Sequence, residues 1–393
     1  MYLSYKFSKQ IIFTALFAIT VFFLTRQVPY NNYSFIMNIT LFLFIVLSFF
    51  SNKIDIKEFD KKLINIFGIF LSTLLLYSIL IAENDINHAL KFYIILTLLF
   101  LTYFIKGNKA YIDVFLILIT LQAIVVIGIF IFMSLNFDLT TYLPIRKYFE
   151  LNEWGDVYTF DGNFWYVKIR GNALLPIGFF ISILYLSGYK RIFVSGMILL
   201  ACIFSNTAFL LAIGIFLMGL IILKLNSTKK KVYFVLFMVL TGILCSFMII
   251  NFNIDLLSAK ESSMGTRYDQ FSVLINDLFS HNFTSLFGTG LGHTIDIVSG
   301  MRDYRGDIYF ELQTLYIANQ LGLIFFVFYF IAHLVLSLIH IKRYELLFVY
   351  VCYLIYAFSN PYVFDTNHFV VIVLLLSLRK VLDEKNILNT RSI

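Results

Sequence analysis

The sequence is a succession of apolar runs, many of them close to 20 residues long and separated by short charged segments. A helix needs about 20 apolar residues to cross the roughly 30 Å hydrocarbon core of a membrane, because it rises about 1.5 Å per residue. Hydrophobic residues make up 60% of the chain and charged residues 13%, about half the charged fraction of a typical soluble domain. These features exclude a large soluble core and predict an all-α, polytopic membrane protein.

The apolar runs predict about twelve spanning helices, which form a single transmembrane domain over residues 1–393. The expected spans are 10–26, 34–51, 63–81, 90–105, 111–134, 172–188, 191–204, 207–224, 232–250, 311–340, 345–358 and 365–381. The polar stretch 205–207 interrupts the apolar run 192–223. We therefore expect two short helices there instead of one long helix.

The distribution of positive charge gives these helices an orientation. With the break at 205–207, alternate connections counted from the N-terminus hold 20 of the 30 Lys and Arg residues and carry a net charge of +13, whereas the other side carries −6. Positive charge concentrates on the cytoplasmic side of membrane proteins, so we expect both termini and the segments 52–62 and 224–231 in the cytoplasm. The excess of basic residues is therefore explained by the orientation of the helices in the membrane, and we expect no nucleic-acid partner.

Two long loops remain on the other side, at 135–171 and 251–310. Because the cytoplasmic connections are short, these loops are where a polar site has room. The three cysteines lie inside apolar runs without the spacing of metal ligands. We therefore expect no metal site and no cofactor.

The first loop combines acidic, basic and aromatic residues. Trp154 and Trp165 offer aromatic faces for sugar rings, although an aromatic belt at the membrane interface is the alternative for any one of these residues. Arg170 precedes Gly171 at the start of an expected helix, where a guanidinium and backbone N–H groups could bind a phosphate. The alternative for Arg170 is an interfacial arginine whose charged end reaches the water.

The second loop contains an expected amphipathic helix from Arg267 to Phe279, whose apolar side would rest on the membrane surface. Gly288, Gly290 and Gly292 follow, and alternating glycines permit tight turns and close approach of the backbone to a ligand. A nucleotide-binding fingerprint would need a βαβ unit, so we exclude it.

The C-terminal part of the second loop contains candidate acid–base groups and cations. His293 follows the glycines directly and is a candidate base, and Arg302 and Arg305 precede Glu311 at the start of the next span. Glu311 and Asn319 are expected on one helix face at the membrane surface. The alternative for Glu311 is an acidic residue that the helix dipole favours at an N-terminus.

These features together resemble the O-antigen polymerase (Wzy) family and, more distantly, the O-antigen ligases. The likeness covers nearly the whole chain and includes the span number, the cytoplasmic termini, the two large loops and the order of the motifs. The residues that match are Arg170, Gly171, Arg267, Gly288, Gly290, Gly292, Glu311 and Gly322. The chain departs from the pattern at Ser205-Asn206, where relatives often carry Ser-Arg, and at Asn172, the one candidate for an asparagine expected slightly later.

The resemblance implies a multi-pass protein of the bacterial inner membrane whose active site faces the periplasm. It implies a metal-independent glycosyltransferase that joins oligosaccharide repeat units carried on undecaprenyl diphosphate, in lipopolysaccharide O-antigen synthesis. The implied partners are these lipid-linked glycans, membrane lipid, and a chain-length regulator and flippase of the same pathway. An O-antigen ligase and a 12-helix flippase or transporter are the alternatives.

The resemblance also distributes roles among the candidate residues. It assigns the diphosphate to Arg170 and Arg267, with Arg302 and Arg305 as second choices. Glu311 is the first candidate for the base that acts on the acceptor hydroxyl, and His293 the second. The residues expected to stack on sugars are Trp154, Trp165, Tyr268 and Tyr316.

The expected topology can be tested directly. A reporter fused after Lys230 should give a cytoplasmic signal, because the break at 205–207 returns the chain to the positively charged side. A periplasmic signal would overturn the break and the placement of both long loops.

Overall fold

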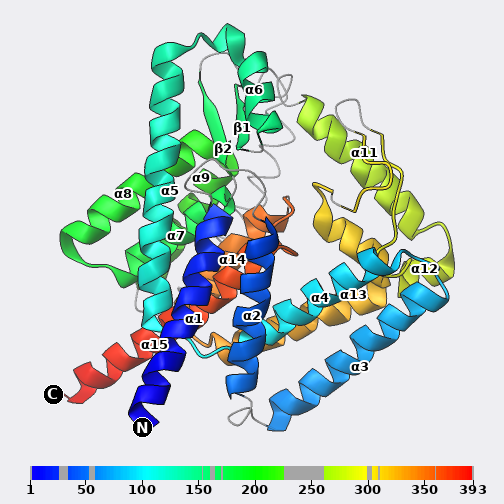
Figure 1. The fold of residues 1–393 in the computed structure, drawn as a ribbon, viewed down its shortest axis with the longest axis horizontal. Coiled ribbons are helices and arrows are strands. Elements are labelled where there is room, and N and C mark those ends of the chain that lie inside the picture. The colour runs from blue at the N-terminus through cyan, green and yellow to red at the C-terminus, as the bar shows by residue number, and fades with distance from the viewer. Residues whose placement is uncertain are drawn as a thin grey trace.

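The computed structural model describes residues 2–25, 34–52, 58–152, 154–159, 164–169, 171–224, 261–298, 303–308, 310–358 and 360–391. Helices dominate these ranges (Figure 1). The N-terminal part contains α1 (Tyr2–Thr25), α2 (Ser34–Asn52), α3 (Glu58–Leu80), α4 (Ile86–Leu101), α5 (Lys109–Asn136), α6 (Tyr142–Leu151), α7 (Leu175–Tyr185), α8 (Gly188–Ser205) and α9 (Thr207–Lys224). The C-terminal part contains α11 (Glu261–Leu278), α12 (Asn282–Phe287), α13 (Gln313–His340), α14 (Tyr344–Phe358) and α15 (Thr366–Arg391).

Several of these helices have the length and composition of membrane spans. Within the described ranges, five are long and apolar enough to cross a membrane: Asp60–Leu80, Ile86–Phe104, Lys109–Asn136, Gly188–Ser205 and Gln313–His340. Shorter apolar helices accompany them. The prediction of a helical membrane protein is therefore confirmed at this level.

Most helix boundaries follow the expected spans to within five residues, but α1 begins already at Tyr2 and α15 continues to Arg391. The expected span 232–250 lies outside the described residues. The predicted break at 205–207 is also present. Asn206 has an extended backbone (φ −163°, ψ 130°) between α8 and α9. Asn172 fixes this break, because its buried side-chain amide donates to Ser205 Oγ at 2.9 Å and to the Val167 carbonyl at 3.0 Å. The asparagine therefore ties the first loop to the break.

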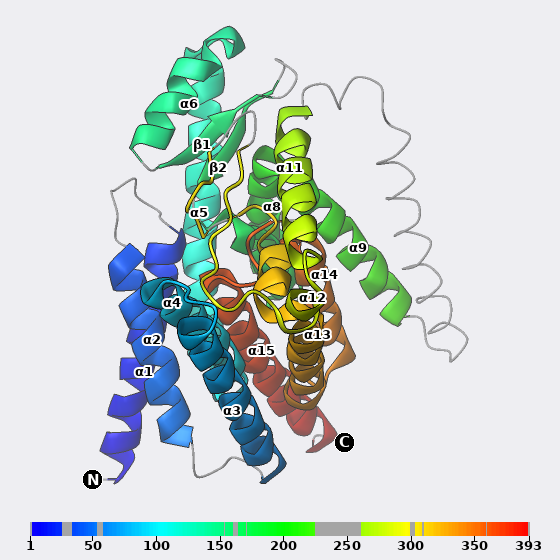
Figure 2. The same ribbon diagram turned by 90° about the vertical axis from the view of Figure 1, so that its right-hand side faces the viewer.

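A short β-hairpin is an element that the sequence did not lead us to expect. Strands β1 (Gly155–Tyr158) and β2 (Tyr166–Ile169) pair antiparallel, with Asp156 opposite Lys168. The hairpin packs with α6 on a small apolar cluster that includes Trp165 and Phe149. Figure 2 shows α6, the hairpin and α11 at the end of the bundle opposite both chain termini. The described parts of the two long loops thus share one end of the molecule.

The long helix α13 is interrupted at Gly322, whose backbone is far from helical (φ 71°, ψ 165°). The interruption releases carbonyls that would otherwise accept bonds inside the helix. The glycine-rich loop satisfies them, since Thr289 N donates to the Asn319 carbonyl at 3.0 Å and Gly290 N to the Gln320 carbonyl at 3.1 Å. The loop and the first half of α13 therefore form one unit.

Helix α11 contains the predicted amphipathic segment and begins earlier, at Glu261. Its Leu274 and Leu278 are buried against the protein, and the helix packs on α13. The expectation that its apolar side rests on the membrane surface is wrong for these two leucines. Their burial in the protein instead anchors α11 beside the interrupted helix.

The alternating glycines are needed for contact between protein segments. Gly288, Gly290 and Gly292 all have positive φ, and a Cβ on Gly288 would lie 2.1 Å from the Gln320 carbonyl oxygen. A Cβ on Gly292 would lie 2.5 Å from the backbone nitrogen of Ala89. The close approach that we predicted is therefore made to the backbone of α13 and α4.

Replacing Gly288 or Gly322 by alanine should destabilise the protein. The backbone of Gly288 (φ 85°, ψ 170°) and of Gly322 (φ 71°, ψ 165°) lies in a region essentially confined to glycine, which costs a residue with a Cβ about 1–3 kcal/mol. Each Cβ would also meet backbone atoms of the other segment. Thermal unfolding of the purified variants should show a lower midpoint. Gly265→Ala is the matched control, because its Cβ meets nothing within 4 Å; equal midpoints for all three variants would contradict the role of the break.

Candidate functional site

An ion pair joins the two ends of the second loop. Arg267 Nε on α11 lies 3.0 Å from Glu311 Oε2, just before α13, with 36% and 24% of the two side chains exposed. Buried Gln270 supports this contact, because its side-chain oxygen accepts a hydrogen bond from Leu312 N at 3.1 Å. The structure therefore brings together two residues that the sequence singled out separately, at a position that solvent can reach.

The β-hairpin of the first loop supplies charged groups near this pair. Arg146 on α6 pairs with Asp156 at 2.9 Å and with Glu150 at 3.1 Å. Burial raises the pKa of Asp156, and the charge of Arg146 opposes that rise. Asp156 and Lys168 face each other across the hairpin. The hairpin thus positions the cation Lys168 opposite an acid, Asp156, that is paired with Arg146.

Lys168 connects the hairpin electrostatically to the Arg267–Glu311 pair. Burial lowers the pKa of its ammonium group, and the charges of Asp156, Arg267 and Glu311 also act on it. Its Nζ lies 5.0 Å from the centre of the Tyr158 ring, a favourable arrangement for a cation. The charges of the first loop and of the second loop therefore act on one another.

A third segment reaches the cluster from the connection between α14 and α15. Burial raises the pKa of the Tyr362 hydroxyl, and the charges of Arg267 and Glu311 act on that group as well. Neither Tyr362 nor Lys168 is among the site residues predicted from the sequence. Neither has a local sequence signal, because the charges of Arg267 and Glu311 that act on both come from segments far away in the chain.

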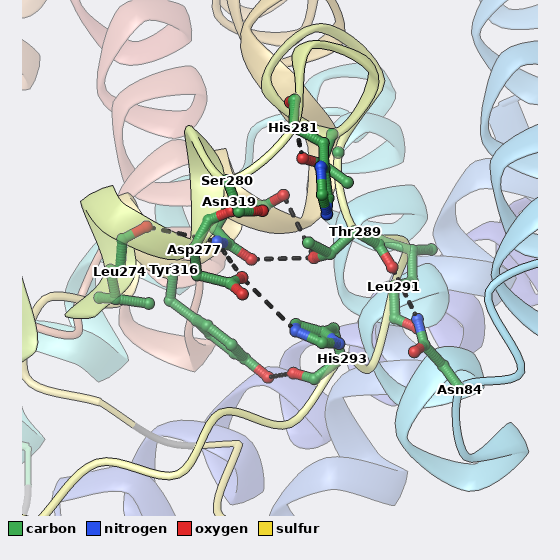
Figure 3. A network of polar contacts seen from close by, with 12 residues as sticks. Asn84, Leu274, Asp277, Ser280, His281, Thr289, Leu291, His293, Tyr316 and Asn319 are labelled. Carbon is green, nitrogen blue, oxygen red and sulfur yellow. Dashed lines mark hydrogen bonds and ion pairs between the residues drawn. The ribbon is translucent and has the colours of Figure 1, made fainter.

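A second polar cluster surrounds His293 (Figure 3). His293 Nε2 lies 3.5 Å from Asp277 Oδ2 on α11. The same carboxylate oxygen accepts a hydrogen bond from Asn319 Nδ2 at 2.8 Å, and Thr289 Oγ1 donates to Asn319 Oδ1 at 2.8 Å. The Tyr316 hydroxyl donates to the His293 backbone carbonyl. The imidazole is therefore oriented by a carboxylate that is itself held in place.

The two clusters lie at different heights on α11. Arg267 and Asp277 are ten residues apart on this helix, which separates them by about 15 Å along its axis at 1.5 Å per residue. A single reacting atom cannot contact both. Glu311 contacts Arg267 and His293 contacts Asp277, so the two candidate bases belong to different polar clusters.

The predicted aromatic residues are placed unequally. Trp165 is 2% exposed and Tyr316 is fully buried, so neither ring can stack on a sugar in this conformation. Trp154 packs edge-on against Phe149, with ring centres 5.5 Å apart. Tyr268 is 72% exposed, beside Arg267. Of the four, Tyr268 is the most exposed, whereas Trp165 packs in the small apolar cluster and Tyr316 donates to the His293 backbone carbonyl.

Of the remaining predicted cations, the structure describes Arg305 alone. Arg170 and Arg302 lie outside the described residues. Arg305 is paired with its neighbour Asp303, at 2.5 Å, on an exposed turn. Hydrogen bonds from Arg305 lower the pKa of Asp303 to about 2. The charge of Arg305 is thus balanced locally.

A scan against models of protein families, a search of curated proteins and a search of solved structures each found no match. Within the described part of the chain, no three His, Cys, Asp or Glu side chains are grouped as metal ligands. The function is therefore inferred from the side chains themselves.

The Asp277 carboxylate should stabilise the fold in a pH-dependent manner. The hydrogen bond from His293 lowers the pKa of Asp277 below its ordinary value of 3.8, and Asn319 lowers it further. This stabilisation is therefore fully present above about pH 4 and is lost as the pH falls through the depressed pKa. Asp277→Asn should lower the unfolding midpoint at pH 7, and the difference from the parent protein should shrink below pH 4.

Thermal unfolding of the purified protein across this range provides the measurement. Asp269→Asn, on the same helix, is the control for loss of a carboxylate. A constant difference at all pH values would mean that the charge of Asp277 contributes nothing.

Proposed function

We propose that the chain is a surface-polysaccharide polymerase of the bacterial inner membrane, of the O-antigen polymerase type. In this proposal it has about twelve spans, cytoplasmic termini and periplasmic loops. The observation that carries the proposal is the partly exposed Arg267–Glu311 pair, whose charges also act on Lys168 of the hairpin. The hairpin and α11, which carries Arg267, lie at the end of the helical bundle opposite the termini (Figure 2). Such a site combines cations with a carboxylate at the depth of a lipid head group.

The reaction in the proposal is a glycosyl transfer. The acceptor sugar hydroxyl attacks the anomeric carbon of the donor glycan, and the new glycosidic C–O bond forms as the C–O bond to the diphosphate breaks. The bonding electrons leave with the polyprenyl diphosphate, whose developing negative charge needs fixed cations. Arg267 suits this role, because a guanidinium stays charged and binds phosphate oxygens through two N–H groups.

Glu311 is the proposed base for the acceptor hydroxyl, and it takes up the proton that the hydroxyl loses. Its contact with Arg267 places a carboxylate within reach of a glycan whose diphosphate is bound there. His293 lies with Asp277, about 15 Å along α11 from Arg267. The geometry therefore favours Glu311 over His293 for this step.

Arg267→Ala and Glu311→Gln should both stop chain extension. We expect a loss of roughly 10²-fold or more in polymerisation for removal of the base and a comparable loss for removal of the cation. In cells that depend on this chain, a surface-polysaccharide gel should then show single-repeat glycans in place of a ladder. Lys147→Ala, an exposed cation of the first loop, should keep the ladder; unchanged ladders for Arg267→Ala and Glu311→Gln, with normal protein levels, would contradict the proposed function.

A further inference from the structure

The charged residues of the two loops differ in whether their charge is already balanced. Arg146 is paired with two carboxylates, Arg267 with Glu311 and Arg305 with Asp303. Among the residues that the structure describes, Lys168 has no carboxylate within the 4.0 Å of an ion pair. A partly buried ammonium group without an ion pair is costly unless an anion joins it.

The surroundings of Lys168 hold it in place without neutralising it. The β1–β2 register sets Asp156 opposite it, but Arg146 occupies that carboxylate at 2.9 Å. The Tyr158 ring lies beneath both cations, 5.0 Å from Lys168 Nζ and 5.9 Å from the Arg146 guanidinium carbon. The hairpin therefore presents a positioned cation whose cross-strand acid, Asp156, is paired with Arg146.

The Lys168 ammonium group interacts with charged groups of the second loop. The charges of both Arg267 and Glu311 act on it. Burial lowers its pKa, and an approaching anion would favour the charged form again. A group with two or more negative charges that binds at Lys168 would therefore also be attracted by Arg267, whose charge acts on the same place.

We propose that Lys168 is a ligand of the lipid-linked diphosphate, opposite Arg267, so that the two loops bind the leaving group between them. This inference rests on the proposed function for the identity of the anion. Lysine suits the position because its ammonium is a compact charge on a flexible stem, which can follow a phosphate as the C–O bond breaks. Arg267, already paired with Glu311, then shares the charge of the diphosphate with a cation that has no ion pair among the described residues.

Binding of geranylgeranyl diphosphate to the purified full-length protein in nanodiscs tests this assignment. We expect Lys168→Met to weaken binding roughly tenfold, because a hydrogen bond to a charged group is lost. Lys168→Arg should bind within about threefold of the parent protein, since it keeps the charge. Lys147→Met is the matched control: it lies on α6 in the same loop, is exposed, and should bind like the parent protein.

The comparison with geranylgeraniol separates the head group from the lipid chain. Lys168→Met should leave the weak binding of the alcohol unchanged, because the alcohol carries no phosphate. Equal diphosphate affinity for Lys168→Met and Lys147→Met would overturn the proposal. If the glycan ladder requires Arg267 while Lys168→Met binds normally, the role of Lys168 falls and the proposed function stands. If binding requires Lys168 but no variant changes the ladder, the anion site stands and the polymerase assignment falls.

A measurement on the unmodified protein removes any dependence on the folding of variants. Reductive methylation followed by mass spectrometry reports how accessible each lysine is. Geranylgeranyl diphosphate should protect Lys168 and leave Lys147 unprotected. Equal labelling of Lys168 with and without the diphosphate would contradict the assignment.

Discussion

The interruption of α13 at Gly322 organises the outer end of this molecule. It exposes the carbonyls of Asn319 and Gln320, and unpaired carbonyls in an apolar surrounding are costly. The glycine-rich loop supplies the missing donors from Thr289 and Gly290. The single non-helical residue Gly322 therefore holds the glycine-rich loop against the first half of α13.

The first half of α13 then positions both polar clusters. It begins directly after Glu311, whose partner Arg267 lies on α11, and it carries Asn319, which holds Asp277 on the same α11. Because both contacts join the same two helices, α11 cannot move without disturbing both. The hairpin approaches from the other loop and adds Lys168. Charges that are partly buried, like these, interact more strongly than charges in water.

Much of this arrangement could be predicted from local sequence. The helices follow apolar runs and the break at Asn206 follows its polar neighbours. Arg267 and Glu311 were predicted because each opens an expected helix in or directly after the second loop. Lys168 and Tyr362 could not be found in this way, because their neighbours come from segments far away in the chain. The tryptophans and the glycines show a related limit. The sequence indicates that a tryptophan packs against another group and that a glycine allows close approach of the backbone, but it leaves open whether the neighbour is protein or ligand.

The central claim is that this end of the bundle transfers glycans from a lipid diphosphate. Purified protein incubated with a synthetic polyprenyl-diphosphate-linked oligosaccharide, followed by mass spectrometry, tests it most directly. The account predicts glycans of two and more repeat units on the lipid, with release of one polyprenyl diphosphate for each new linkage. Recovery of the substrate unchanged by a folded, membrane-reconstituted protein, or its movement across the bilayer without any new linkage, would contradict it.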